Sequence, residues 1–298
     1  MSSTALSGMV IAIFGPTASG KTAVAEAIAD AVPAQIVSAD SMQVYQGLPI
    51  LTNQPDPPTG LAGIWPLDHE GSVAEYQRLA HEVVDGALSN GRAPVVVGGT
   101  GLYLRAALAD LELPPAPPPG ARERWERLYE RVGPEKAHAA LAERDLQAAE
   151  TVHPNDRRRV VRALELHEAG GSLAPPRDRL WSDETRHPTL IFGLDVPKAV
   201  LEERIRRRTE AMFESGVEEE VARALRAPVS RTASQIIGLR EIAELPPNEA
   251  VAAIALRTRR YAAYQRKWMR RIPGVQTVSA DHSAAEIAAE VLARAQEA

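Results

Sequence analysis

The chain contains no cysteine, so neither a disulfide framework nor a thiolate metal site can form. Long apolar runs are also missing. The first apolar segment, Met9 to Phe14, is far shorter than the roughly 20 residues that a helix needs to cross a bilayer. The residues before it lack the basic stretch of a secretory signal. We therefore expect a cytoplasmic protein without membrane contact.

An excess of positive charge is missing as well. The 34 Lys and Arg against 39 Asp and Glu give a net charge of −5, which by itself argues against a nucleic-acid partner. The average hides an asymmetry, because only 4 of those cations lie within residues 1–110 and the other 30 follow. With 298 residues, of which 45% are hydrophobic, the chain is long enough for one large domain or two ordinary ones.

Short apolar segments alternate with amphipathic ones. Strands are predicted over residues 9–14, 35–37, 94–97, 189–196 and 276–279, and helices over residues 22–32, 72–89, 198–215, 248–271 and 283–296. Strands that are apolar on both faces and that alternate with helices are typical of an α/β fold with a parallel sheet.

The middle of the chain has a different pattern. Pro114 to Gly120 can neither continue a helix nor pair in a sheet, so it predicts a boundary. Residues 121–169 are helical and charged, and a loop over residues 170–188 follows. We expect residues 1–119 to form the first part of an α/β core, 120–187 a helical insertion, and 188–298 the second part of the core with basic C-terminal helices.

The strongest motif is GPTASGKT, which matches the phosphate-loop pattern GxxxxGK[ST] and lies between a predicted strand and helix. Its backbone N–H groups and the positive end of the following helix favour phosphate oxygens, Lys21 adds a charge, and Thr22 can hold Mg²⁺. The alternative is a glycine-rich turn without a ligand. The predicted phosphate-binding residues are Gly15, Pro16, Thr17, Ala18, Ser19, Gly20, Lys21 and Thr22.

Two further strand ends carry polar residues. Asp40, in SADSMQVY, can be a metal ligand, a general base or a helix N-cap. After the third strand, GGTGL has glycines that leave room for a ligand and Thr100 with a hydroxyl to offer, or it is a plain turn before a helix. Asn53 to Asp56 (NQPD) lacks the Lys of a guanine-reading NKxD element, whereas a small-molecule kinase stays open.

Seven strings occur in the order of the tRNA dimethylallyltransferase (IPP transferase) family, which the chain resembles from about residue 10 to residue 271. They are GPTASGKT, SADSMQVYQGL, VVVGGTGLYLRAAL, HPNDRRRVVRALE, RIRRRTEAMFESG, QIIGLREI and RTRRYAAYQRKWMRR. The resemblance implies a P-loop NTPase-like parallel sheet core with an inserted helical domain. It also implies a monomer that transfers a dimethylallyl group from dimethylallyl diphosphate to N6 of adenine 37, in the anticodon loop of tRNAs that read codons beginning with U.

The resemblance assigns roles to individual residues. Asp40 matches the general base, while Lys21, Thr100, Arg208 and Thr22 with Mg²⁺ would neutralise the departing diphosphate. Arg208 has an alternative interpretation as part of a solvated helix face, because three other arginines crowd residues 204–207. The matched tRNA contacts are Asp40, Ser41, Met42, Gln43, Thr100, Arg122, Arg158, Arg159, Val160, Val161 and Arg162.

Two basic runs would track an RNA backbone, unless they are merely solvated faces: residues 157–162 hold four Arg, and residues 257–271 hold seven cations. The chain departs from the family pattern at Met42, at Gln54 in LTNQP and over residues 64–68 (IWPLD). These changes affect the contacts around the adenine. The alternatives are an isopentenyltransferase acting on free adenine nucleotides, a P-loop small-molecule kinase and a phosphate-switched binding module.

Overall fold

The chain divides into two compact units in the computed structural model, which describes residues 8–114, 117–174 and 179–297. Leu111–Ser182 form one unit, and the residues before and after it form the other. The boundaries therefore lie earlier than residues 120 and 187. Residues 186 and 187 belong to the core because both side chains bond the Asp85 carboxylate, at 2.9 and 2.8 Å. Residues 115–116 of the expected linker and 175–178 of the expected loop lie outside the described residues.

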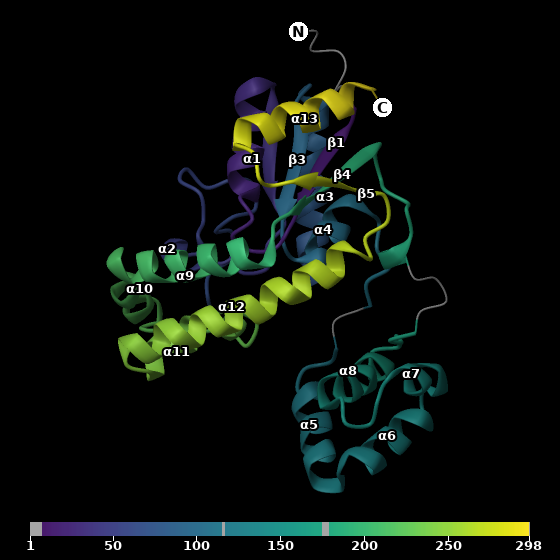
Figure 1. Cartoon of the computed structure of the whole chain (residues 1–298). Coiled ribbons are helices and arrows are strands. Elements are labelled where there is room, and N and C mark those ends of the chain that lie inside the picture. The colour runs from purple at the N-terminus through teal and green to yellow at the C-terminus, as the bar shows by residue number, and fades with distance from the viewer. Residues whose placement is uncertain (1–7, 115–116, 175–178, 298) are drawn as a thin grey trace. The chain divides into compact units, whose positions relative to one another are not determined.

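The larger unit is built on a parallel sheet with the strand order β2-β3-β1-β4-β5 (Figure 1). The strands are β1 (Val10–Phe14), β2 (Ala34–Ser38), β3 (Ala93–Gly98), β4 (Thr189–Asp195) and β5 (Val275–Ser279). All five predicted strands are confirmed. Every residue of β1 and β3 is buried, which explains why these central strands read as unbroken apolar runs.

Helices cover both faces of this sheet (Figure 1). The helices of this unit include α1 (Lys21–Ala31), α3 (Val73–Ser89), α4 (Gly101–Leu108), α9 (Lys198–Glu214), α12 (Pro247–Met269) and α13 (Ala284–Glu297). Packing of α1 beside α13 closes a core that includes Ile28, Val95, Phe192 and Val291. The short helices α2 (Pro49–Thr52), α10 (Val217–Ala224) and α11 (Leu239–Glu244), and two 3₁₀ turns, were not predicted, because their apolar patterns span too few turns.

The smaller unit contains α5 (Ala121–Val132), α6 (Pro134–Ala142), α7 (Leu146–Thr151) and α8 (Arg157–Glu168), which agrees with the predicted helical pattern. Its own apolar core includes Leu141, Val160 and Leu164. Across the described parts of both units, no helix combines the length and the apolar composition that a membrane span requires.

The sheet brings three loops to one edge. β1 pairs with β3 so that Phe14 lies opposite Gly98, and β2 pairs with β3 so that Ser38 lies opposite Val97. Because the strands are parallel, the loops that follow Phe14, Ser38 and Gly98 all leave from the same carboxyl edge. The predicted phosphate loop, the Asp40 segment and the Thr100 turn are these three loops.

Candidate functional site

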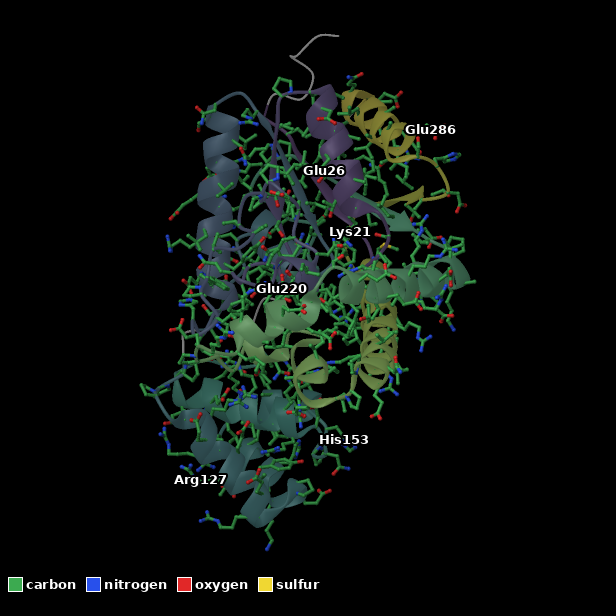
Figure 2. The ribbon with its side chains drawn as sticks, turned by 90° about the vertical axis from the view of Figure 1, so that its left-hand side faces the viewer. Lys21, Glu26, Arg127, His153, Glu220 and Glu286 are labelled. Atoms are coloured by element: carbon green, nitrogen blue, oxygen red, sulfur yellow. The ribbon has the colours of Figure 1, made fainter. Side chains whose placement is uncertain are left out.

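The phosphate loop has the backbone that its sequence predicts. Ala18 and Gly20 have positive φ angles of 63° and 90°, and Gly20 is the N-cap of α1. The Lys21 ammonium donates to the Pro16 carbonyl at 2.8 Å, and the Ser19 N–H donates to the same carbonyl at 3.2 Å. Figure 2 shows Lys21 at the end of α1 that faces this loop, with Glu26 farther along the helix. A loop curled around its own backbone and capped by a helix N-terminus suits an anion.

A cavity of about 510 Å³ lies at this edge of the sheet. Its volume falls within the range of about 300–1,000 Å³ that is typical of small-molecule sites. Gly15, Pro16, Ser19, Ser41 and Thr100 do not line it. The predicted site residues that line the cavity are Thr17, Ala18, Gly20, Lys21, Thr22, Asp40, Met42, Gln43 and Arg208.

Charged groups converge in the cavity. Desolvation lowers the pKa of Lys21 to about 8, the Asp40 carboxylate acts in the opposite direction, and the Arg208 guanidinium adds to the lowering. Burial likewise lowers the pKa of Arg208, and Asp40 again opposes the shift. The Asp40 carboxylate is therefore close to two partly desolvated cations, and the negative charge of a diphosphate would compensate the positive charge of both.

Arg208 lines the cavity and does not belong to a solvated face. Its guanidinium donates to the Thr17 hydroxyl at 3.0 Å. Two exposed arginines of the same helix pair instead with glutamates: Arg206 with Glu203 and Glu210, and Arg207 with Glu203. Helical spacing explains the choice, because residues 205, 208, 209 and 212 share one face of α9 and all four line the cavity.

An apolar wall accompanies the charged groups. Met212 lies about one helical turn from Arg208, so their backbone positions are about 6 Å apart along the axis and both side chains line the cavity. The cavity can therefore take a ligand that is anionic over one part and aliphatic over another. The large aliphatic side chains that line it are Leu51, Ile205, Met212, Ile237 and Ile254.

Asp40 is not a helix N-cap. Residues 41–44 form turns instead of a helix, and the Asp40 Oδ1 atom accepts from the Met42 N–H at 2.9 Å. Beside it, the Thr100 hydroxyl is 3.2 Å from both the backbone N–H and the hydroxyl of Ser41, and 3.1 Å from the Tyr261 hydroxyl. Thr100 thus supports the Asp40 turn from outside the cavity.

The Met42–Pro55 segment is held by two glutamine side chains. Gln43 accepts from the Ser38 hydroxyl at 3.0 Å and donates to the Asn53 carbonyl at 2.7 Å. Gln54, one of the departures from the family pattern, donates to the carbonyls of Gln43 and Tyr45 at 2.9 and 2.7 Å. The Gln54 departure therefore retains a donor, and it orders the loop from within.

Of the two consecutive glycines at the end of β3, Gly98 lines the cavity and Gly99 does not, and both are packed closely against other parts of the protein. A Cβ atom on Gly98 would lie 2.0 Å from the Ala39 carbonyl oxygen, and one on Gly99 would lie 2.2 Å from Nε2 of Gln265. On Gly101 it would meet the Trp268 ring at 2.2 Å. The space is filled by the neighbouring loop and by α12, so these glycines serve close packing within the protein.

The insertion holds the remaining predicted tRNA residues. Arg122 and Arg162 both approach the buried carboxylate of Glu165, at 3.6 and 3.2 Å. Val160 and Val161 are buried, so their side chains do not face a solvent-exposed ligand. Arg158 and Arg159 are exposed and make no ion pair with any residue that the structure describes. The four arginines therefore differ in environment although they are close in sequence.

Sequence reasoning missed the contribution of α12. Thr258 and Tyr261 line the cavity, and Gln265 bonds the phosphate loop. A signal existed: residues 254, 258, 261, 265 and 268 share one helix face, and no cation of the basic run falls on those positions. The charges of the basic run do not indicate this uncharged face of α12.

The cavity can accommodate a metal ion if a bound substrate supplies most of the ion's ligands. Across the residues that the structure describes, no group of three or more His, Asp or Glu side chains is preformed. The Thr22 hydroxyl lines the cavity at the start of α1. Such a site suits Mg²⁺, which keeps waters and binds through few protein oxygens together with substrate phosphates.

Comparison with known proteins agrees with this geometry. A family model described as IPP transferase matches residues 43–272, and one described as Isopentenyl transferase matches residues 8–58. The tRNA dimethylallyltransferase of Streptomyces coelicolor is 40% identical over 293 residues, covering 94% of this chain and 93% of that protein.

Solved structures show the same similarity. The tRNA isopentenylpyrophosphate transferase of Bacillus halodurans superposes with a TM-score of 0.67 at 30% identity and covers 97% of both chains. The corresponding enzyme of Staphylococcus epidermidis gives a TM-score of 0.69 at 27% identity, covering 97% of this chain and 99% of that one. The core thus has a P-loop NTPase-like fold, and the chain belongs to the IPP transferase family.

Proposed function

We propose that the protein transfers a dimethylallyl group from dimethylallyl diphosphate to N6 of adenine 37 in tRNAs that read codons beginning with U. One observation carries the proposal: a single cavity combines a phosphate loop, two cations and an aliphatic wall with the Asp40 carboxylate. A kinase would have to bind a nucleotide, which gives no reason for an aliphatic wall. A prenyl diphosphate matches both the phosphate loop and the aliphatic wall. The names of the similar proteins point to the same reaction.

The reaction needs three contributions from the chain. The N6 nitrogen attacks the allylic carbon, the bond from that carbon to the diphosphate oxygen breaks, and the diphosphate leaves with the electron pair. Lys21 and Arg208 stabilise the negative charge that grows on the leaving oxygen. Asp40 accepts the proton that N6 loses. An exocyclic aromatic amine is a weak nucleophile, so accurate placement of N6 supplies much of the rate.

Mg²⁺ fits this site through the Thr22 hydroxyl and the phosphate oxygens of the donor. When bound, it would add positive charge beside the leaving diphosphate. Thr100 acts differently from the direct contact that the resemblance implies. Through Ser41 and Tyr261 it holds the Asp40 turn in place.

The insertion is proposed to grip the anticodon stem and loop. Exposed Arg158 and Arg159 supply charge for phosphates, while Arg122 and Arg162 are oriented by Glu165. Asp40, Ser41, Met42 and Gln43 would contact the extruded adenine. A monomeric, cytoplasmic enzyme stays a prediction that sedimentation and fractionation check.

Product analysis tests the reaction. The protein is incubated with Mg²⁺ and labelled dimethylallyl diphosphate, together with an unmodified tRNA carrying A36 and A37, the same tRNA with G36, or AMP. Label in the first tRNA alone is expected. Label in AMP instead would identify a free-nucleotide enzyme. Phosphate transfer from ATP without any prenyl product would identify a kinase and refute the proposal.

Asp40→Asn tests the base. Asparagine keeps the Oδ1 atom that accepts from the Met42 N–H but cannot take the N6 proton. We expect the single-turnover rate to fall by about 10²- to 10⁴-fold, with tRNA affinity within threefold of the wild type. The control is Asp30→Asn on the exposed face of α1, which should change neither. Lost tRNA binding with intact single-turnover chemistry would make Asp40 structural.

A further inference from the structure

Helix α12 presents one polar side chain to two loops of the site at once. Gln265 has 2% of its surface exposed, and it is one of the few buried polar side chains in the described residues. It lies on the same helix face as Ile254, Thr258 and Tyr261, all of which line the cavity. A buried amide must find partners for both its donor and its acceptor, because an unpaired group costs about 1–3 kcal/mol.

Both partners are backbone groups of the catalytic edge. The Oε1 atom of Gln265 accepts from the Thr17 N–H at 2.8 Å, and Nε2 donates to the Gly99 carbonyl at 2.9 Å. An N–H can only donate and a carbonyl can only accept, so these partners fix the orientation of the amide. Of the side chains of this length, only glutamine carries a donor and an acceptor in this arrangement without having to bind a proton.

Each anchored residue leads directly to a group of the reaction. Thr17 also accepts a bond from Arg208 through its hydroxyl, so its backbone and side chain are both fixed. Gly99 precedes Thr100, which bonds Ser41 beside Asp40. One amide therefore ties the loop that would hold the diphosphate to the turn that carries the base.

We infer that Gln265 is a positioning residue, which sets the distance between the phosphate loop and the Asp40 turn so that donor and base are aligned. The inference rests on the proposed function for its catalytic consequence, and it also has a consequence for binding alone. Because the Thr17 N–H is committed to Gln265, Thr17 is not a backbone donor to phosphate, and diphosphate is held by the other residues of the loop.

Gln265→Met is the main variant, because methionine has a similar length and no charge but makes neither hydrogen bond. We expect the single-turnover rate at saturating donor and tRNA to fall by about 100-fold, the effect of displacing a reacting group by about 1 Å. Affinity for inorganic diphosphate should fall about tenfold, whereas tRNA affinity should stay within threefold of the wild type. The control is Gln296→Glu, an exposed position near the end of α13.

Gln265→Glu supplies a readout that simple loss of packing would not give. As a carboxylate, the new side chain still accepts from Thr17 but repels the Gly99 carbonyl. When protonated, it donates again. The ratio of the variant rate to the wild-type rate should therefore rise as pH falls from 8 toward 5.5, whereas the ratio for Gln265→Met should stay constant.

Hydrogen exchange of the Thr17 amide can be measured in the wild type, without any variant. We expect this exchange to be slow both with and without inorganic diphosphate. Fast exchange, or a folded Gln265→Met protein whose rate and diphosphate affinity stay within threefold of the wild type, would overturn the inference. Failure of the wild type to prenylate tRNA is a separate result. It would refute the proposed reaction, while diphosphate affinity and Thr17 exchange would still decide the role of Gln265.

Discussion

The lowered pKa of Lys21 makes donor binding depend on pH. With a pKa of about 8, the ammonium group is mostly charged at pH 7 and mostly neutral at pH 9. A diphosphate binds the charged form, so its dissociation constant should rise as pH increases through that pKa. For one titrating group, the rise between pH 7 and pH 9 is about tenfold. The Asp40 carboxylate and the Arg208 guanidinium are the charged groups that act on Lys21. Burial raises the pKa of Tyr261, so this phenol stays neutral throughout.

Calorimetry with dimethylallyl diphosphate in the absence of tRNA measures this effect. By linkage, binding raises the pKa of Lys21, so roughly half a proton should be taken up on binding at pH 8. This uptake makes the observed binding enthalpy depend on the ionisation enthalpy of the buffer. Lys21→Arg keeps a permanent charge and should flatten the profile. A wild-type dissociation constant that changes less than twofold from pH 7 to pH 9, without proton uptake, would refute the assignment of a desolvated Lys21 to the phosphate site.

Three further substitutions follow from packing and charge. Gly99→Ala would force a Cβ atom to within 2.2 Å of the α12 amide, so the Tm should fall by ~5 °C together with the single-turnover rate. The two carboxylate oxygens of Glu220 accept from two backbone N–H groups of α2, at 2.7 and 2.8 Å, and Glu220→Gln replaces one of these oxygens. The free energy of unfolding in urea should fall by ~2 kcal/mol. Glu218→Gln, at an exposed position, is the control and should not lower it. Arg158→Ala should weaken tRNA binding and lower its salt slope by about one, and Arg157→Ala, which removes a partner of Glu130, should do less.

The sheet and the phosphate loop are predictable because local sequence determines them. A strand buried on both faces must be apolar throughout, so β1 and β3 are recognisable without any knowledge of their neighbours. The position of Asp40 follows from one further rule, that parallel strands end at a common edge. The resemblance to a family was needed to choose Arg208 among four closely spaced arginines, although helical spacing with Ile205 and Met212 supports the same choice.

Contacts between distant parts of the chain were not predictable. Gln265 bonds a residue 248 positions earlier, and nothing near it in sequence marks that partner. The glycines at the end of β3 were interpreted as space for a ligand, and sequence does not reveal that Ala39, Gln265 and Trp268 pack against Gly98, Gly99 and Gly101. For the same reason Val160 and Val161 looked like part of a basic surface, whereas both side chains are buried.

The distribution of charge indicates that α12 is a candidate RNA-binding surface in addition to the insertion. Residues 111–182 carry 12 cations and 12 anions, and several of those arginines, such as Arg124 and Arg157, pair with glutamates. On α12 and at its C-cap, by contrast, four exposed cations make no ion pair with any described residue: Arg259, Arg260, Lys267 and the C-cap residue Arg270. Tyr264, with 54% of its surface exposed, lies between Arg260 and Lys267 at helical spacing, where it is available for base stacking.

Helix α12 therefore presents two faces that lie about half a turn apart. One carries Tyr261 and Gln265 toward the site, and the cations without ion pairs project from the opposite side. A nucleic acid bound along the second face would contact the same helix whose Gln265 connects the phosphate loop to the Asp40 turn. A net charge of −5 does not exclude RNA binding, because exposed cations without ion pairs to any described residue are concentrated on α12 and at Arg158 and Arg159 of the insertion.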